Sequence, residues 1–194
     1  MIVPIVEGHA ERESVPLFIR RLLHDQQVFD LPVRQGIRVP RDQLLKRHEL
    51  ERKVEYARRQ DGAQAVVILV DADDDCPRDV AIDARRRGEP VAAGMPVSVV
   101  LAKTEIEAWF IAGIESLRGF QGIGHDAASP ADPEDIRDAK GWLSRHMVTG
   151  RTYVPAHNQA SMAARVDYQL AATRSRSLRK FIKDVTQIAD RLRS

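Results

Sequence analysis

AVVILVDADDD, residues 65–75, is the stretch that decides the fold class. Its first six residues are apolar and rich in β-branched side chains, which is typical of a central strand buried on both faces of a parallel sheet. Four of the five residues that follow are aspartates, namely Asp71, Asp73, Asp74 and Asp75. Carboxylates packed this closely repel one another and add nothing to a core. Their presence therefore indicates a binding role at the end of the strand.

The segments around 65–75 alternate between strand and helix patterns. Apolar runs predict further strands at 2–6, 33–39 and 97–101. Apolar residues at helical spacing predict a helix after the first strand, helices over 42–60 and 77–88, and one after residue 101. This alternation predicts an α/β fold with a mostly parallel sheet flanked by helices.

The chain changes character after residue 118. Residues 119–132 are rich in Gly, Pro, Ser and Asp and lack apolar periodicity, so we expect a loop or linker there. Helical patterns follow over 133–147, 159–172 and 177–193, the last with the clearest apolar stripe. We therefore predict an α/β core over 1–118 and a C-terminal helical lobe over 133–194 that packs on this core.

The bulk composition indicates an ordinary globular protein. The chain has 194 residues, 43% of them hydrophobic and 30% charged, and a formal net charge of +2, so overall charge points to no partner. Cys76 is the only cysteine, which excludes an internal disulfide and favours a cytoplasmic location. The N-terminal apolar stretch ends at Glu7 and is too short for a membrane span or a signal peptide, so we expect no membrane association.

Acidic side chains follow three of the predicted strands. Because the carboxyl ends of parallel strands meet at one edge of a sheet, we expect these side chains to converge. Converging carboxylates are the preferred ligands of hard divalent cations, so the sequence predicts a site for Mg²⁺ or Mn²⁺. The candidate metal ligands are Glu7, Glu11, Asp71, Asp73, Asp75, Glu105 and Glu107.

Other aspartate-rich motifs fit less well. An EF-hand loop that begins at Asp71 requires glycine and glutamate where Cys76 and Ile82 stand. The chain contains neither GxxxxGK[ST] nor GxGxxG, so no nucleotide-binding loop is evident. Two alternatives stay open for the individual aspartates. A lone aspartate after a strand is often a turn residue, and Asp74 and Asp75 are also placed to cap the helix near Pro77.

Three motifs in order, VEGHAE (6–11), VDADDD (70–75) and AKTEIEAWF (102–110), resemble a Toprim domain. Toprim domains are the metal-binding catalytic domains of topoisomerases, bacterial primases and OLD-type nucleases. The resemblance implies a Toprim-like core in which Glu7, Asp71 and Asp73 are catalytic. Asp71 and Asp73 would bind metal, and Glu7 would be a ligand or the general acid/base. The remaining acids, Glu11, Glu105 and Glu107, would hold a second ion.

A closer resemblance covers nearly the whole chain. It is to small stand-alone Toprim-like proteins of an uncharacterised domain family, whose genes often lie beside those of ABC or SMC-like ATPases in suspected defence systems. The helical tail of that family carries a tyrosine, an acid-glutamine pair, a later aspartate and a serine-rich turn. The matching positions here are Tyr153, Asn158-Gln159, Asp167 and 175–181. Asn158 departs from the acid that is usual at its position.

The leading hypothesis is a divalent-metal-dependent nuclease or related phosphodiester-transfer enzyme. Candidate contacts to nucleic acid are Arg85, Arg86, Arg87, Arg174, Arg176, Arg179 and Lys180, each of which also fits a solvated charged face. The alternative is a non-catalytic or conditionally active partner of an ABC/SMC-like ATPase, with the apolar stripe of the last helix either docking that partner or packing on the sheet. A small-molecule phosphohydrolase that uses the same acids is a third possibility.

Overall fold

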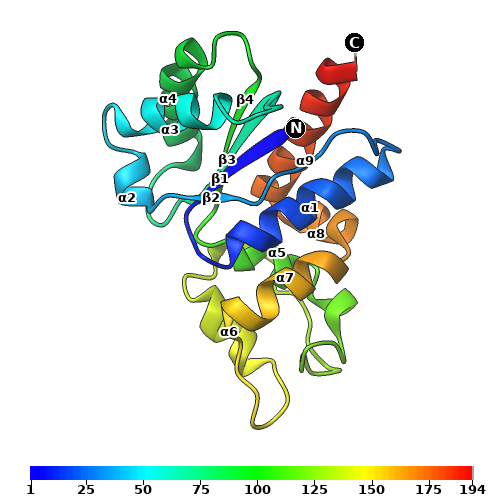
Figure 1. Ribbon diagram of the computed structural model, residues 1–194. Coiled ribbons are helices and arrows are strands. Elements are labelled where there is room, and N and C mark those ends of the chain that lie inside the picture. Colours follow the sequence, from blue (N-terminus) through cyan, green and yellow to red (C-terminus); the bar gives the residue numbers. More distant parts are fainter. Residues whose placement is uncertain (194) are drawn as a thin grey trace.

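The computed structural model describes residues 1–193, and its centre is a four-stranded parallel sheet in the order β2-β1-β3-β4. The strands are β1 (Ile2–Val6), β2 (Ile37–Arg38), β3 (Ala65–Asp71) and β4 (Val97–Ala102). Helices cover both faces of the sheet, as Figure 1 shows. The predicted α/β fold class, with a helical region after the core, is therefore confirmed.

The register of β3 determines where the acidic side chains meet. β3 lies between β1 and β4, with Leu69 opposite Val6 and Asp71 opposite Ala102. Residues 65–70 are buried, as their continuous apolar character predicts. Because all three strands run in the same direction, the segments that leave β1, β3 and β4 emerge at the same edge of the sheet.

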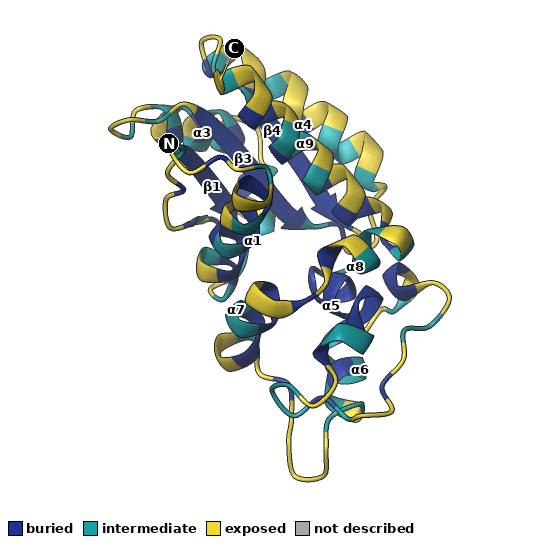
Figure 2. Ribbon diagram, turned by 90° about the vertical axis from the view of Figure 1, so that its right-hand side faces the viewer, coloured by how far each residue is buried: buried dark blue, intermediate teal, exposed yellow. Residues whose placement is uncertain are grey.

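Two layers of helices bury the two faces of the sheet. One face is covered by α2 (Arg41–Leu44), α3 (Glu49–Arg58) and α4 (Pro77–Val91). The other is covered by α1 (Glu11–Asp25), α5 (Glu107–Ala112) and α9 (Arg176–Arg193), with α7 (Pro155–Arg165) and α8 (Tyr168–Arg174) outside them. Figure 2 shows the buried residues of the second layer turned toward the strands.

The helices that follow residue 133 share one hydrophobic core with the sheet. Trp109 of α5 packs edge-on against Phe18 of α1 at 5.7 Å between ring centroids, and against Phe181 of α9 at 5.2 Å. The connecting region contains short 3₁₀ turns at Ile114–Leu117 and Pro133–Asp135, and then α6 (Ala139–Arg145). The division into 1–118, 119–132 and 133–194 stays a prediction.

The apolar stripe of α9 is part of this core. Leu178, Phe181, Val185, Ile188 and Ala189 are buried, and α9 packs on β4 and α1. The interpretation of the stripe as packing on the sheet is therefore confirmed, and the stripe is not free to dock a partner. Within residues 1–193 neither α9 nor any other helix has the length and apolar character needed to cross a membrane.

Several predicted elements are shorter than expected. The predicted helix over 42–60 is divided into α2 and α3 by a turn in which His48, directly before α3, has a φ of 69°, a left-handed conformation that a continuous helix does not contain. The pattern over 159–172 is divided into α7 and α8 by the extended Val166 and Asp167, and Asp167 caps α8 by accepting a hydrogen bond from the Leu170 N–H. The strand at 33–39 is reduced to β2, and of 133–147 only α6 is an α-helix.

Candidate metal centre

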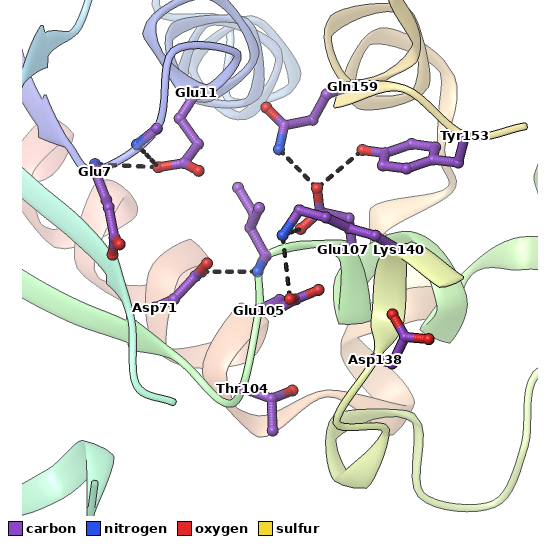
Figure 3. Close-up of polar contacts among 12 residues, drawn as sticks. Glu7, Glu11, Asp71, Thr104, Glu105, Glu107, Asp138, Lys140, Tyr153 and Gln159 are labelled. Carbon is purple, nitrogen blue, oxygen red and sulfur yellow. Dashed lines mark hydrogen bonds and ion pairs between the residues drawn. The ribbon is translucent and has the colours of Figure 1, made fainter. Parts of the chain in front are cut away.

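Five acidic side chains surround one space at the carboxyl edge of the sheet. Glu7 follows β1, Glu11 begins α1 and Asp71 ends β3, while Glu105 and Glu107 lie in the segment that leads from β4 into α5. Figure 3 shows their side chains directed toward the region between β1, β3 and α5. The predicted convergence of acids from three distant segments is therefore a feature of the structure.

Glu11 is held over the turn that follows β1. Its Oε2 accepts hydrogen bonds from the backbone N–H of Glu7 at 3.1 Å and of Gly8 at 2.9 Å. A Cβ at position 8 would lie only 2.6 Å from Oε1 of Glu11, so any larger residue there would displace this carboxylate. Burial is the main cause that raises the pKa of Glu11, and repulsion from Glu107 and Glu7 raises it further. The two hydrogen bonds lower this pKa, but the net shift is upward.

Asp71 occupies the middle of the acidic group. Its Oδ1 accepts a hydrogen bond from the Ile106 N–H at 2.9 Å, which joins the end of β3 to the segment that follows β4. Burial raises the pKa of Asp71 well above its ordinary value, and repulsion from Glu11, Glu107 and Glu7 raises it further. Attraction to Lys140 opposes this rise in the pKa of Asp71 and does not prevail.

Glu107 is fully buried, with 0% of its surface exposed. Its position follows from local sequence, because Trp109 and Phe110 of the same short helix are anchored in the core. Oε1 of Glu107 accepts hydrogen bonds from the Tyr153 hydroxyl at 3.1 Å and from Nε2 of Gln159 at 3.3 Å. Burial raises the pKa of Glu107, and it also raises the pKa of Tyr153, which therefore remains a hydrogen-bond donor.

The ammonium group of Lys140, on α6, lies among these carboxylates. Its Nζ is 3.2 Å from Oε1 of Glu105 and 3.4 Å from Oε2 of Glu107. Burial works to lower the pKa of Lys140, but attraction to Glu107 and Glu105 prevails and raises it. No sequence motif marks Lys140 as a site residue, and it comes from a helix distant in sequence from the acids.

Removal of the Tyr153 hydroxyl tests how far its hydrogen bond orients Glu107. We expect Tyr153→Phe to weaken divalent-metal binding about 10-fold, because groups that orient metal ligands are typically worth 10–100-fold in affinity. Isothermal titration with Mn²⁺ measures this change, with Tyr56→Phe on the exposed face of α3 as the matched control. Equal affinities for Tyr153→Phe and the control would contradict the assigned role of Tyr153.

Asp73 and Asp75 are both directed toward Arg41. The Nε of Arg41 donates to the carbonyl oxygen of Asp71 at 2.9 Å, and its guanidinium pairs with Asp73 at 3.7 Å and with Asp75. The side chains of Asp73 and Asp75 are 62% and 55% exposed. Asp73 has a φ of 49°, a strained conformation of the kind that clusters at functional sites.

Glu7 and Asp73 still share a surface. They line a shallow pocket of about 310 Å³ together with Gly8, Arg38, Pro40, Arg41 and Asp42. Repulsion from Asp73 raises the pKa of Glu7, although burial of Glu7 is the larger cause. The metal roles of Asp73 and Asp75 stay predictions.

The capping interpretation of Asp74 and Asp75 is wrong. The N-cap residue of α4 is Cys76, and no side chain caps this helix. Asp74 instead pairs with Arg137 at 3.0 Å, and Asp75 pairs with Arg41. Arg41 was not identified from the sequence, because it lies on α2 and reaches the aspartates only through the packing of β2 beside β1.

In the part of the chain that the structure describes, the buried Oε2 atoms of Glu7, Glu105 and Glu107 lack a hydrogen-bond donor, although Oε2 of Glu107 lies 3.4 Å from the ammonium group of Lys140. Within residues 1–193, no three His, Cys, Asp or Glu side chains are grouped closely enough to form a metal site as they stand. The donor set consists of carboxylate oxygens and matches the preference of a hard divalent cation, which would supply the missing partner.

The predicted nucleic-acid contacts lie on α4, α8 and α9. Arg87 joins α4 to α3 through Glu51 at 2.9 Å, and Arg174 joins α8 to Glu115 at 2.8 Å, so both have structural roles. The other predicted nucleic-acid contacts have exposed side chains: Arg85, Arg86, Arg176, Arg179 and Lys180. Arg85, Arg176 and Lys180 line a groove between α4 and α9. Their contact with nucleic acid stays a prediction.

Fold and site together define an α/β protein with a buried acidic centre at the carboxyl edge of a parallel sheet. The profile of the family described as a domain of unknown function, DUF4276, matches residues 6–186. Because the match covers most of the chain, the protein belongs to this family. No curated protein and no solved structure matches the chain.

Proposed function

We propose that this protein is a divalent-metal-dependent nuclease or a related phosphodiester-transfer enzyme of the Toprim type, which uses Mg²⁺ or Mn²⁺. The observation that carries the proposal is the gathering of Glu7, Glu11, Asp71 and Glu107 in one largely buried place, with their pKa values raised. Such shifts at the carboxyl end of a parallel sheet are typical of functional sites. The order of the three acidic motifs along the chain supports the Toprim assignment.

The residues divide into three roles. Glu11 and Asp71 would hold the metal together with Glu7, and Glu105 and Glu107 would complete its shell or hold a second ion. A bound divalent cation supplies Lewis-acid polarisation of a phosphoryl group and activation of water. Glu7 is the candidate for proton transfer, because it is only half-buried, its pKa is raised and its Oε2 lacks a partner. Lys140 provides a positive charge for a substrate phosphate.

Cleavage assays test the proposal directly. We expect single- or double-stranded DNA or RNA to be cut in the presence of Mg²⁺ or Mn²⁺ and not in the presence of a chelator. Glu7→Gln should lower the rate by at least about 100-fold, as expected when a proton-transfer group is lost. Glu13→Gln, an exposed change in the same part of the chain, is the matched control. Cleavage that persists in chelator or in Glu7→Gln would reject the assignment.

Two other outcomes identify the alternatives. Metal-dependent hydrolysis of nucleotides without cleavage of polymers would indicate the small-molecule phosphohydrolase. Cleavage that requires an added ABC/SMC-like ATPase would indicate the conditionally active partner, the second candidate. That candidate is favoured by one observation, a groove of mixed apolar and charged lining along the sheet edge formed by β4.

A further inference from the structure

β4 forms one edge of the sheet and lies between two helices. α4 contacts it from one face and α9 from the other, an arrangement that Figure 2 shows. Two adjoining cavities, of about 570 Å³ and 370 Å³, follow this edge. Val99 and Leu101 line the first cavity, and Val97 and Ser98 line the second. We call this feature the β4 groove.

The backbone of β4 has unpaired polar groups on the side of the groove. The carbonyl oxygens of Pro96 and Ala102 accept hydrogen bonds from the Val66 and Ala72 N–H groups, at 2.9 and 2.8 Å. In a parallel pair, alternate residues direct their N–H and C=O groups to the neighbouring strand. The polar groups of the intervening residues Val97, Val99 and Leu101 therefore face outward.

These outward groups are poorly satisfied. No hydrogen bond joins the backbone of Val97, Val99 or Leu101 to any side chain or to any other element in the part of the chain from 1 to 193. Val99 and Leu101 are only 3% exposed. Backbone groups in such a position are normally paired, and an added strand pairs them in the most regular way.

The walls of the β4 groove carry positive charge. Arg85, Lys103 and Lys180 are paired with Glu89, Asp135 and Asp184, respectively. Arg78 on α4 and Arg176 on α9 are exposed, and among residues 1–193 no acidic side chain pairs with either. The two guanidinium groups thus stand on opposite walls without a counter-charge.

This charge distinguishes between possible occupants. Arg78 and Arg176 lie at the end of the groove that Val99 and Leu101 line. A segment with acidic side chains would neutralise them. Ile82, which is exposed and also lines the groove, provides an apolar contact for the side chains between the acids.

We propose that the β4 groove binds an extended acidic segment of a partner protein, which adds a strand to the sheet beside β4. The outward N–H and C=O groups of Val97, Val99 and Leu101 pair with its backbone, and Arg78 and Arg176 bind its carboxylates. The proposal does not depend on metal chemistry, since the groove lies along the side of the sheet and the acids lie at its carboxyl edge.

The test uses the full chain and blocked eight-residue fluorescent peptides in which glutamate alternates with valine or threonine. Fluorescence anisotropy should detect binding of these peptides, and peptides with lysine in place of glutamate should bind at least about 10-fold more weakly. Hydrogen exchange should show new protection of the Val99 and Leu101 amides in the bound state. The double variant Arg78→Glu/Arg176→Glu should reverse the preference between the two peptides.

A charge-matched control separates the groove from net charge. Arg52→Glu/Arg59→Glu on α3 makes the same change in charge at exposed positions and should leave the glutamate preference intact. Absence of binding by every glutamate peptide would overturn the proposal. Equal binding of the glutamate peptides by Arg78→Glu/Arg176→Glu and by the control variant would also overturn the proposal. Binding of these peptides without new protection of the Val99 and Leu101 amides would overturn it too.

Discussion

Asp71→Asn should abolish metal-dependent activity and at the same time make the metal-free protein more stable. Loss of the central carboxylate should lower kcat/KM by more than about 100-fold, because even outer groups at metal sites are worth 10–100-fold. The gain in stability arises because Asp71 is buried among Glu11, Glu107 and Glu7, which raise its pKa. Asparagine removes this repulsion and keeps an oxygen for the hydrogen bond from Ile106.

The gain is expected as a higher free energy of unfolding at neutral pH, where the raised pKa of Asp71 makes ionisation of its carboxyl unfavourable to folding. In a chain of this size, that corresponds to a rise in Tm of about 2–4 °C per kcal/mol. Differential scanning calorimetry in chelator measures it, with the exposed Asp61→Asn as control. If Asp71→Asn is inactive but less stable than wild type, the Asp71 carboxylate stabilises the metal-free fold, and the expected relief of repulsion is contradicted.

The second large effect concerns pH. A carboxyl with a pKa raised in the folded state binds more protons when folded, so the free energy of unfolding falls as pH rises above the unfolded value of about 4. Glu7, Glu11, Asp71 and Glu107 all have raised pKa values. The raised pKa of Lys140 has no effect in this window, because its contribution to stability is lost only in the alkaline range.

We therefore expect the metal-free protein to have a higher Tm at about pH 5.5 than at about pH 8. Mg²⁺ at 100 times its Kd should restore about 2.7 kcal/mol at pH 8, or about 5–10 °C, and less at pH 5.5, because the raised pKa values make protons stronger competitors of the ion at lower pH. Thermal denaturation over a grid of pH and Mg²⁺ concentration measures both effects. Asp71→Asn should flatten both dependences, and an equal response to Mg²⁺ at the two pH values would contradict the account.

The fold was accessible from sequence because its signals are local. The apolar runs at 2–6, 65–70 and 97–101 mark three of the strands, and the acids that follow them mark the edge where the site lies. Element boundaries were less accessible, since breaks such as the left-handed His48 depend on how α2 and α3 pack against the sheet.

The site was predicted only in part, because the decisive contacts are tertiary. Asp73 and Asp75 pair with Arg41, whereas the Asp71 side chain accepts a hydrogen bond from the Ile106 N–H. The spacing of the aspartates in the sequence does not indicate this difference. The placement of Lys140 between Glu105 and Glu107 also depends on a helix that lies beyond the sheet. Tyr153 and Gln159 were noted only through a family resemblance, and the structure gives both a physical role as donors to Glu107.

The most direct test of the account is an anomalous-scattering map from a crystal soaked in Mn²⁺. We predict a peak at the carboxyl edge of the sheet, within direct coordination distance, about 2.0–2.5 Å, of oxygens from Asp71 and from Glu7 or Glu11. Rotation of their carboxylates toward the ion would account for the wider spacing seen without it. A fully occupied Mn²⁺ elsewhere on the protein, with Asp71 still bound only to the Ile106 N–H, would contradict the assignment of this site.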